Sequence, residues 1–166
     1  MQQKNNLTPN YFSYALYSVI FTALLFILFG SNGWGPSAAN EQAIGEISRW
    51  CERVSGGFFR EPVNTLGNLG FVVTGLYMFY KLSKDATTPK GIIMFSSSSL
   101  ALLYASASTF LGPGSMAMHG THTKFGAWLD NVSMVTYILI LWIYNLKRLS
   151  NFTQKTFYYI YLSILI

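Results

Sequence analysis

The sequence has 166 residues, of which only 10% are charged and 51% are apolar, whereas a soluble domain carries about 25% charged residues. So few charges cannot cover a water-exposed surface, which excludes an ordinary soluble fold. The formal net charge is +5, but the basic residues lie between apolar runs and form no stripe interleaved with aromatic residues, which excludes a nucleic-acid-binding surface.

Several apolar stretches have the length that crosses a bilayer, since about 20 helical residues span its ~30 Å hydrocarbon core. We therefore predict an all-α, polytopic transmembrane helix bundle with four complete spans and the start of a fifth at Thr156. The complete spans are expected from Tyr14 to Gly30, Leu66 to Leu82, Ile92 to Leu111, and Phe125 to Leu146. The chain is still apolar at Ile166, without a polar cap, so we expect a C-terminally truncated sequence that stops inside a helix.

The first apolar stretch follows Lys4 and has a faintly cleavage-like Ser37-Ala38-Ala39 downstream, as a signal peptide would. Its apolar run is long for a signal peptide, which favours a retained anchor. We therefore expect one transmembrane domain over residues 1–166, with an anchor at 14–30, an extracytoplasmic loop at 31–65 and a partial helix bundle at 66–166.

Lysine and arginine positions predict the orientation, because basic residues accumulate in cytoplasmic loops. If the spans alternate, most basic residues share the side of the N-terminus, which places that terminus in the cytoplasm. The loop before the second span and a turn from Gly112 to Lys124 are then extracytoplasmic. The unusual polar residues fall on this same side: Trp50, Glu52, Glu61, Asn64, Ser115, His119, His122 and Asp130.

The segment from Gly112 to His122 contains the residues best suited to chemistry. If the helix continues beyond Pro113, Ser115, His119 and His122 stand at i, i+4 and i+7 on one face. Asp130 follows in the next span, and a helical hairpin would return its carboxylate to that face. Imidazole binds zinc, a carboxylate can orient a ligand or accept a proton, and a serine hydroxyl can donate to an oxyanion. These residue types suit metal-assisted hydrolysis.

The alternative is structural. A serine and a histidine near a membrane interface often hydrogen-bond only to water or carbonyls, and Asp130 would then cap the start of its helix. His122 is the weaker metal candidate, because Gly120 and Thr121 could place it in the turn.

A second polar cluster, with Trp50-Cys51-Glu52 and Glu61-Pro62, precedes the second span. Glu61-Pro62 is typical of a helix start, with proline in the first turn. We favour helix capping here over an oxygen-ligand cation site built from Glu52 and Glu61. Cys51 is the lone cysteine, so it forms no intrachain disulfide and no multi-cysteine metal site.

These two motifs resemble those of the alkaline ceramidase family, within a superfamily of seven-helix membrane hydrolases that includes the adiponectin-receptor-like proteins. The first is Trp50-Cys51-Glu52 with Glu61-Pro62-Val63-Asn64-Thr65-Leu66-Gly67-Asn68-Leu69; the second is Gly114-Ser115-x-x-x-His119 with Asp130. The end of the second motif, Asp130-x-x-Ser133-Met134, resembles that of the bacterial branch of the family. The resemblance covers about residues 49 to 134, and the span from Tyr14 to Gly30 looks like an addition ahead of the family's seven helices.

The resemblance implies a catalytic role for Ser115 and Asp130 and zinc ligation by His119. Two further zinc ligands would come from an HxxxH motif on the last helix, which this sequence lacks. Calcium binding near the first motif is also a family property. It is doubtful at Glu52 and Glu61 here, because Arg49 and Val54 replace the acidic residue and the asparagine of that site.

We expect a zinc-dependent hydrolase that cleaves the linear amide of a ceramide-like membrane lipid. In this mechanism His119 holds zinc, Asp130 is the general base and Ser115 stabilises the oxyanion. The absent HxxxH motif makes activity of this chain alone doubtful. The alternatives are a receptor-like or regulatory member of the superfamily with structural zinc, and a membrane scaffold protein without metal.

Overall fold

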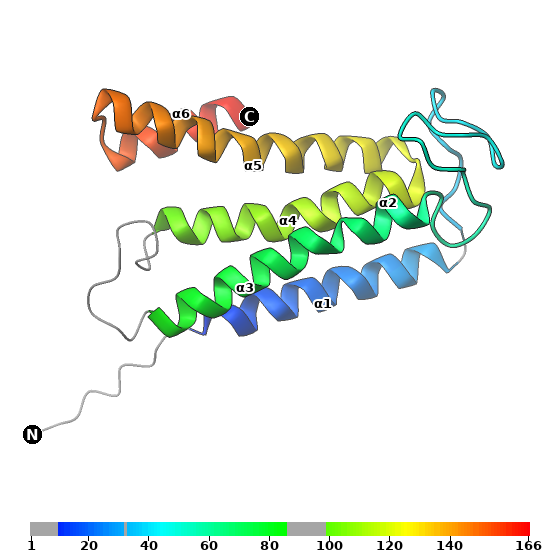
Figure 1. Cartoon of the computed structure of the whole chain (residues 1–166), viewed down its shortest axis with the longest axis horizontal. Coiled ribbons are helices and arrows are strands. Elements are labelled where there is room, and N and C mark those ends of the chain that lie inside the picture. Colours follow the sequence, from blue (N-terminus) through cyan, green and yellow to red (C-terminus); the bar gives the residue numbers. More distant parts are fainter. Residues whose placement is uncertain (1–9, 32, 86–98) are drawn as a thin grey trace, which may run out of the picture.

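The computed structural model describes residues 10–31, 33–85 and 99–166, and their regular structure is helical. The helices are α1 (Tyr11–Gly30), α2 (Pro62–Gly67), α3 (Leu69–Asp85), α4 (Ser99–Thr121), α5 (Lys124–Ser150) and α6 (Gln154–Leu165). Figure 1 shows the long helices running back and forth, with residues 33–61 gathered at one end beside α2 and the α4–α5 connection. This confirms the all-helical prediction.

Local sequence explains several helix boundaries. Asn10, Thr123 and Thr153 are N-caps whose side chains accept hydrogen bonds from backbone N–H groups in the first turns of α1, α5 and α6. Asn151 ends α5 in the left-handed conformation, with φ of 51°. The expected helix start at Glu61-Pro62 is confirmed, because Pro62 is the first residue of α2.

The predicted turn from Gly112 to Lys124 is wrong, because α4 continues through Pro113 to Thr121. Only His122 and Thr123 connect α4 to α5. Pro113 removes one backbone donor, a loss that packing against neighbouring helices can offset in a membrane bundle. The part of the predicted third span at 92–98 lies outside the described residues.

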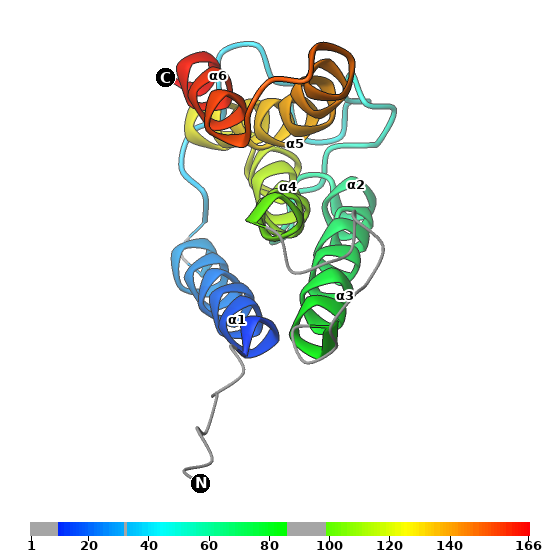
Figure 2. The ribbon, with the colours of Figure 1, turned by 90° about the vertical axis from the view of Figure 1, so that its left-hand side faces the viewer.

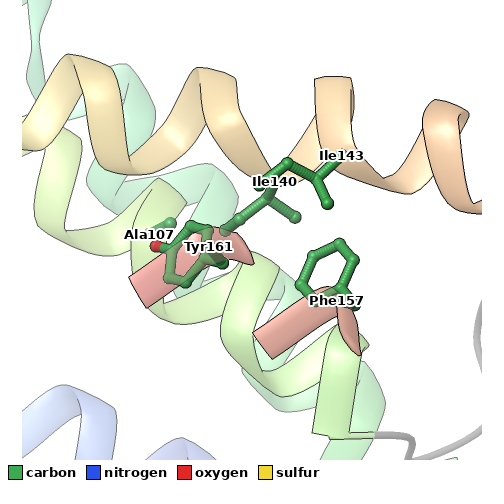
Figure 3. Close-up of a cluster of buried hydrophobic side chains, with 5 residues drawn as sticks. All are labelled: Ala107, Ile140, Ile143, Phe157 and Tyr161. Carbon is green, nitrogen blue, oxygen red and sulfur yellow. The ribbon is translucent and has the colours of Figure 1, made fainter. Parts of the chain in front are cut away.

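Helix α4 occupies the middle of the bundle, between α3 and α5 (Figure 2). Its glycines allow this close packing: a Cβ on Gly112 would lie 2.4 Å from the Val72 side chain, and one on Gly114 would lie 2.4 Å from Ser133. Small residues have this role at helix contacts inside membranes. At the other end of α4, Ala107 joins a buried cluster with Ile140, Ile143, Phe157 and Tyr161 that also fixes α6 (Figure 3).

Two of the described helices, α1 and α5, are long and apolar enough to cross a membrane. The four predicted complete spans are therefore confirmed only in part. Helix α4 has 23 residues but is rich in glycine, alanine and serine, because protein rather than lipid surrounds much of it. On α1, Phe21, Ile27 and Leu28 are among many exposed apolar side chains. An apolar surface of this kind is typical of contact with a membrane.

Candidate functional site

The candidate site lies at the end of the bundle where residues 33–61 meet the last turn of α4 and the first turns of α5. Backbone hydrogen bonds join these segments: Arg60 N–H donates to Gly120 O at 2.9 Å, and Glu61 N–H donates to His119 O at 2.9 Å. Ala38 N–H also donates to His122 O at 2.8 Å. The long loop is therefore attached directly to the residues that carry the predicted chemistry.

The structure brings three of the predicted site residues together across α4 and α5. The Asp130 carboxyl lies close enough to interact with the Ser115 hydroxyl, and it interacts electrostatically with His119. Ser115 is buried, and Asp130 Oδ1 is buried without a hydrogen-bond partner among the described residues. Ser115 and His119 are one helical turn apart on α4, and the antiparallel α4–α5 pair places Asp130 beside them.

Asp130 does not cap its helix. The N-cap of α5 is Thr123, whose hydroxyl accepts a hydrogen bond from Gly126 N–H at 3.0 Å. Asp130 lies nearly two turns further along α5, beyond the reach of the free N–H groups of the first turn. The capping interpretation of this carboxylate is therefore wrong, and its burial needs another explanation.

His122 lies just after α4 in a left-handed backbone conformation, with φ of 55°. Its ring is fully buried between two carboxylates. Nε2 lies 3.2 Å from Glu61 Oε1, and Nδ1 lies 3.7 Å from Glu41 Oε2. The structure thus places His122 in the connection between helices, off the α4 face that carries Ser115 and His119.

Glu61 is the N-cap residue of α2, but its side chain forms no cap. The carboxylate is fully buried, and its Oε2 lies 2.5 Å from His119 Nδ1 and accepts a hydrogen bond from Asn64 Nδ2 at 3.1 Å. Burial raises the pKa of this carboxyl, but hydrogen bonds from Ser48, His119 and Asn64 outweigh it and leave the pKa below its usual value. Glu61 is therefore held as a carboxylate.

Glu52 is the residue that caps α2. Its two carboxylate oxygens accept hydrogen bonds from Val63 N–H at 2.7 Å and Asn64 N–H at 2.8 Å. Glu52 and Glu61 therefore share Asn64 as a partner, through its backbone N–H and its side-chain amide respectively, while Glu61 alone contacts the histidines. The adjacent Arg49 guanidinium donates to Glu41 Oε1 at 2.9 Å.

Sequence reasoning missed two features of this site. It did not find Glu41, which lies in the long loop, and it did not pair Glu61 with His119, 58 positions away in the chain. Local spacing carries no signal for either contact. Trp50, noted only for its position in the first motif, packs edge-on against the His119 ring with centroids 4.9 Å apart.

The donor set is only partly suited to zinc. His119 offers Nε2, and Asp130 Oδ1 is an unpartnered buried oxygen nearby. A catalytic zinc takes three protein ligands, and the described part of the chain contains no group of three or more His, Cys, Asp or Glu residues that could hold a metal ion. Any zinc bound here would need ligands beyond this set.

Comparison with known proteins supports the resemblance of the two motifs. Neither the curated proteins nor the solved structures give a match. The family model described as Ceramidase matches residues 47–166, which is more than half of the chain and includes every predicted site residue. This chain belongs to the ceramidase family.

Proposed function

We propose that this protein is a membrane-embedded, zinc-dependent hydrolase that cleaves the amide bond of a ceramide-like lipid into a long-chain amine and a fatty acid. The observation that carries the proposal is the contact between Asp130 of α5 and Ser115 of α4, beside His119. Membership of the ceramidase family makes such a hydrolase the expected class.

His119 would hold the metal through Nε2, together with ligands outside the described group. Zinc, when bound, supplies a Lewis acid that polarises the amide carbonyl. Asp130 accepts the proton of the attacking water at its buried carboxylate and returns a proton to the leaving amine. Ser115 donates a hydrogen bond to the oxygen of the tetrahedral intermediate. The products balance as one amine and one carboxylic acid for each water consumed.

The exposed apolar surfaces of α1 and α5 support a membrane-embedded enzyme. We further propose that the N-terminus is cytoplasmic and the site extracytoplasmic. The last turn of α3 carries Lys84 and that of α5 carries Lys147 and Arg148, at the end of the bundle opposite the site. Basic residues concentrated at that end favour a cytoplasmic position for it.

The direct test is hydrolysis of ceramide in mixed micelles by the purified full chain, with zinc analysis of the same sample. We expect Asp130→Asn to lower kcat by roughly 10²- to 10⁴-fold, the usual contribution of a general base. Asn131→Ala is the matched control, because Asn131 is exposed and its amide donates a hydrogen bond to Ala127 O within its own helix.

The outcomes separate the rival functions. A wild-type protein that holds stoichiometric zinc but hydrolyses no amide would be a receptor-like member with structural metal. A protein that binds no zinc and is inactive would be a scaffold. Equal activity in wild type and Asp130→Asn would overturn the role of the carboxylate.

A further inference from the structure

The carboxylate of Glu61 contacts both histidines of the chain, one with each oxygen. Oε2 lies 2.5 Å from His119 Nδ1, and Oε1 lies 3.2 Å from His122 Nε2. The chain has two histidines in all. The Glu61 side chain is fully buried, so these contacts are made without competition from water.

Several contacts fix this carboxylate in position. Asn64 Nδ2 donates to Oε2 at 3.1 Å, and the Glu61 backbone N–H donates to the carbonyl of His119 itself. Pro62 follows at the first position of α2, whose start is capped by Glu52. Backbone and side chain of Glu61 are therefore both attached to the segment that carries His119.

The His119 ring is held on a second side by Trp50, which packs edge-on at an interplanar angle of 78°. A carboxylate facing Nδ1 requires the proton on that nitrogen, because an unprotonated Nδ1 would place two lone pairs against each other. The proton on one ring nitrogen leaves the lone pair on the other, so Nε2 becomes the nitrogen that can bind a metal. Metal-binding histidines are commonly oriented through such a bond to a carboxylate.

We propose that Glu61 is a positioning residue that holds His119 in the Nδ1–H tautomer and presents its Nε2 for metal binding. The inference rests on the proposed function for the identity of the metal, but the tautomer itself is a property of the protein without metal. His122 lies against the other oxygen of the carboxylate, with Nε2 3.2 Å from Oε1 but without a hydrogen bond among the described residues, and this contact limits rotation of the Glu61 side chain.

The first experiment is nitrogen NMR of the metal-free full chain, labelled with ¹⁵N-histidine, in detergent micelles. With two histidines the spectrum is simple, and His119→Gln assigns the signal. We expect His119 to show the Nδ1–H tautomer in the wild-type protein. A spectrum in which neither histidine has this tautomer would overturn the inference without the need for any variant.

The second experiment measures zinc affinity by competition with a chromophoric chelator. We expect Glu61→Gln to weaken zinc binding by about 10- to 100-fold, as is usual for loss of the partner of a metal-binding histidine. Glu61→Asp, which keeps the negative charge, should recover part of the lost zinc affinity. Glu46→Gln is the matched control, because this exposed carboxylate accepts a hydrogen bond from Ala43 N–H in the loop and should leave zinc affinity unchanged.

The two proposals fail in different ways. A wild-type protein that binds no zinc would overturn the zinc hydrolase, while the tautomer measurement would still decide the role of Glu61. Unchanged zinc affinity in a folded Glu61→Gln variant, with the wild-type protein binding zinc, would overturn the positioning role alone. Should Glu61→Gln fail to fold, Glu61→Asp and the wild-type spectrum decide the question.

Discussion

Gly114 of α4 faces Ser133 of α5 so closely that a Cβ at position 114 would lie 2.4 Å from the Ser133 hydroxyl oxygen. Ser133 also donates its hydroxyl proton to Asp130 O at 2.8 Å. Gly114 adjoins Ser115, and Ser133 is fully buried one turn after Asp130. The absence of a side chain at Gly114 thus sets the separation of the two helices that bear the candidate catalytic pair.

Gly114→Ala should therefore push α4 and α5 apart. We expect a loss of about 1–3 kcal/mol in unfolding free energy, the usual cost of overpacking, together with a fall in kcat. Thermal unfolding in detergent and the ceramide assay would measure both. Gly70→Ala is the control, because a Cβ there has nothing within 4 Å; an equal loss in both variants would contradict the prediction.

Ser115→Ala should reduce kcat by roughly 10²- to 10³-fold, as does removal of one oxyanion donor, with little change in KM. The expected reason is that the hydroxyl acts on charge that develops only during the reaction. Steady-state kinetics on micellar ceramide would show it. Ser106→Ala provides the comparison, since Ser106 is exposed on α4 and donates to Leu102 O; a rise in KM alone would argue for substrate binding instead.

Glu52→Ala should destabilise the protein by about 0.5–2 kcal/mol, the range for loss of a helix N-cap. Two N–H groups at the start of α2 would lose their acceptor. Chemical denaturation would measure the change. Glu46→Ala removes an exposed carboxylate that bonds to Ala43 N–H in the loop, and it should cost no more than about 0.5 kcal/mol. Equal effects would mean that Glu52 is not a cap.

Calcium should not stabilise this protein. Glu52 is engaged by backbone N–H groups and Glu61 by the histidines, while the positively charged Arg49 lies beside Trp50 and Glu41. Calcium takes 6–8 oxygen ligands, a set these residues do not offer. We expect the same melting temperature in millimolar calcium and in a calcium chelator. A calcium-dependent rise would show that Glu52 changes partners to bind the ion.

Cys51 should react with a membrane-impermeant maleimide added to intact cells. This exposed, free cysteine lies in the loop that we place outside the cytoplasm. Because it is the only cysteine in the chain, the wild-type protein needs no engineering, and Cys51→Ser supplies the background. Labelling that occurs only after the cells are opened would reverse the proposed orientation.

The sequence alone was sufficient for the helical class and for several helix boundaries, because these depend on neighbouring residues. Composition predicted the apolar helices, and Glu61-Pro62 marked the start of α2. The sequence also predicted that Ser115 and His119 lie one turn apart on the same face, provided that α4 continued through Pro113. Neighbouring residues could not predict that the helix continues through Pro113, because this depends on packing of α4 against both α3 and α5.

The sequence by itself determined which chemical groups the site contains: a serine, two histidines and several carboxylates near one end of the helices. Only the tertiary structure decided which carboxylate meets which partner. Asp130 contacts Ser115, Glu61 contacts both histidines, and Glu52 accepts hydrogen bonds from the backbone of α2. Hydrogen bonds between residues far apart in the chain depend on how the helices and the loop pack. The local pattern of apolar and polar residues does not predict that packing.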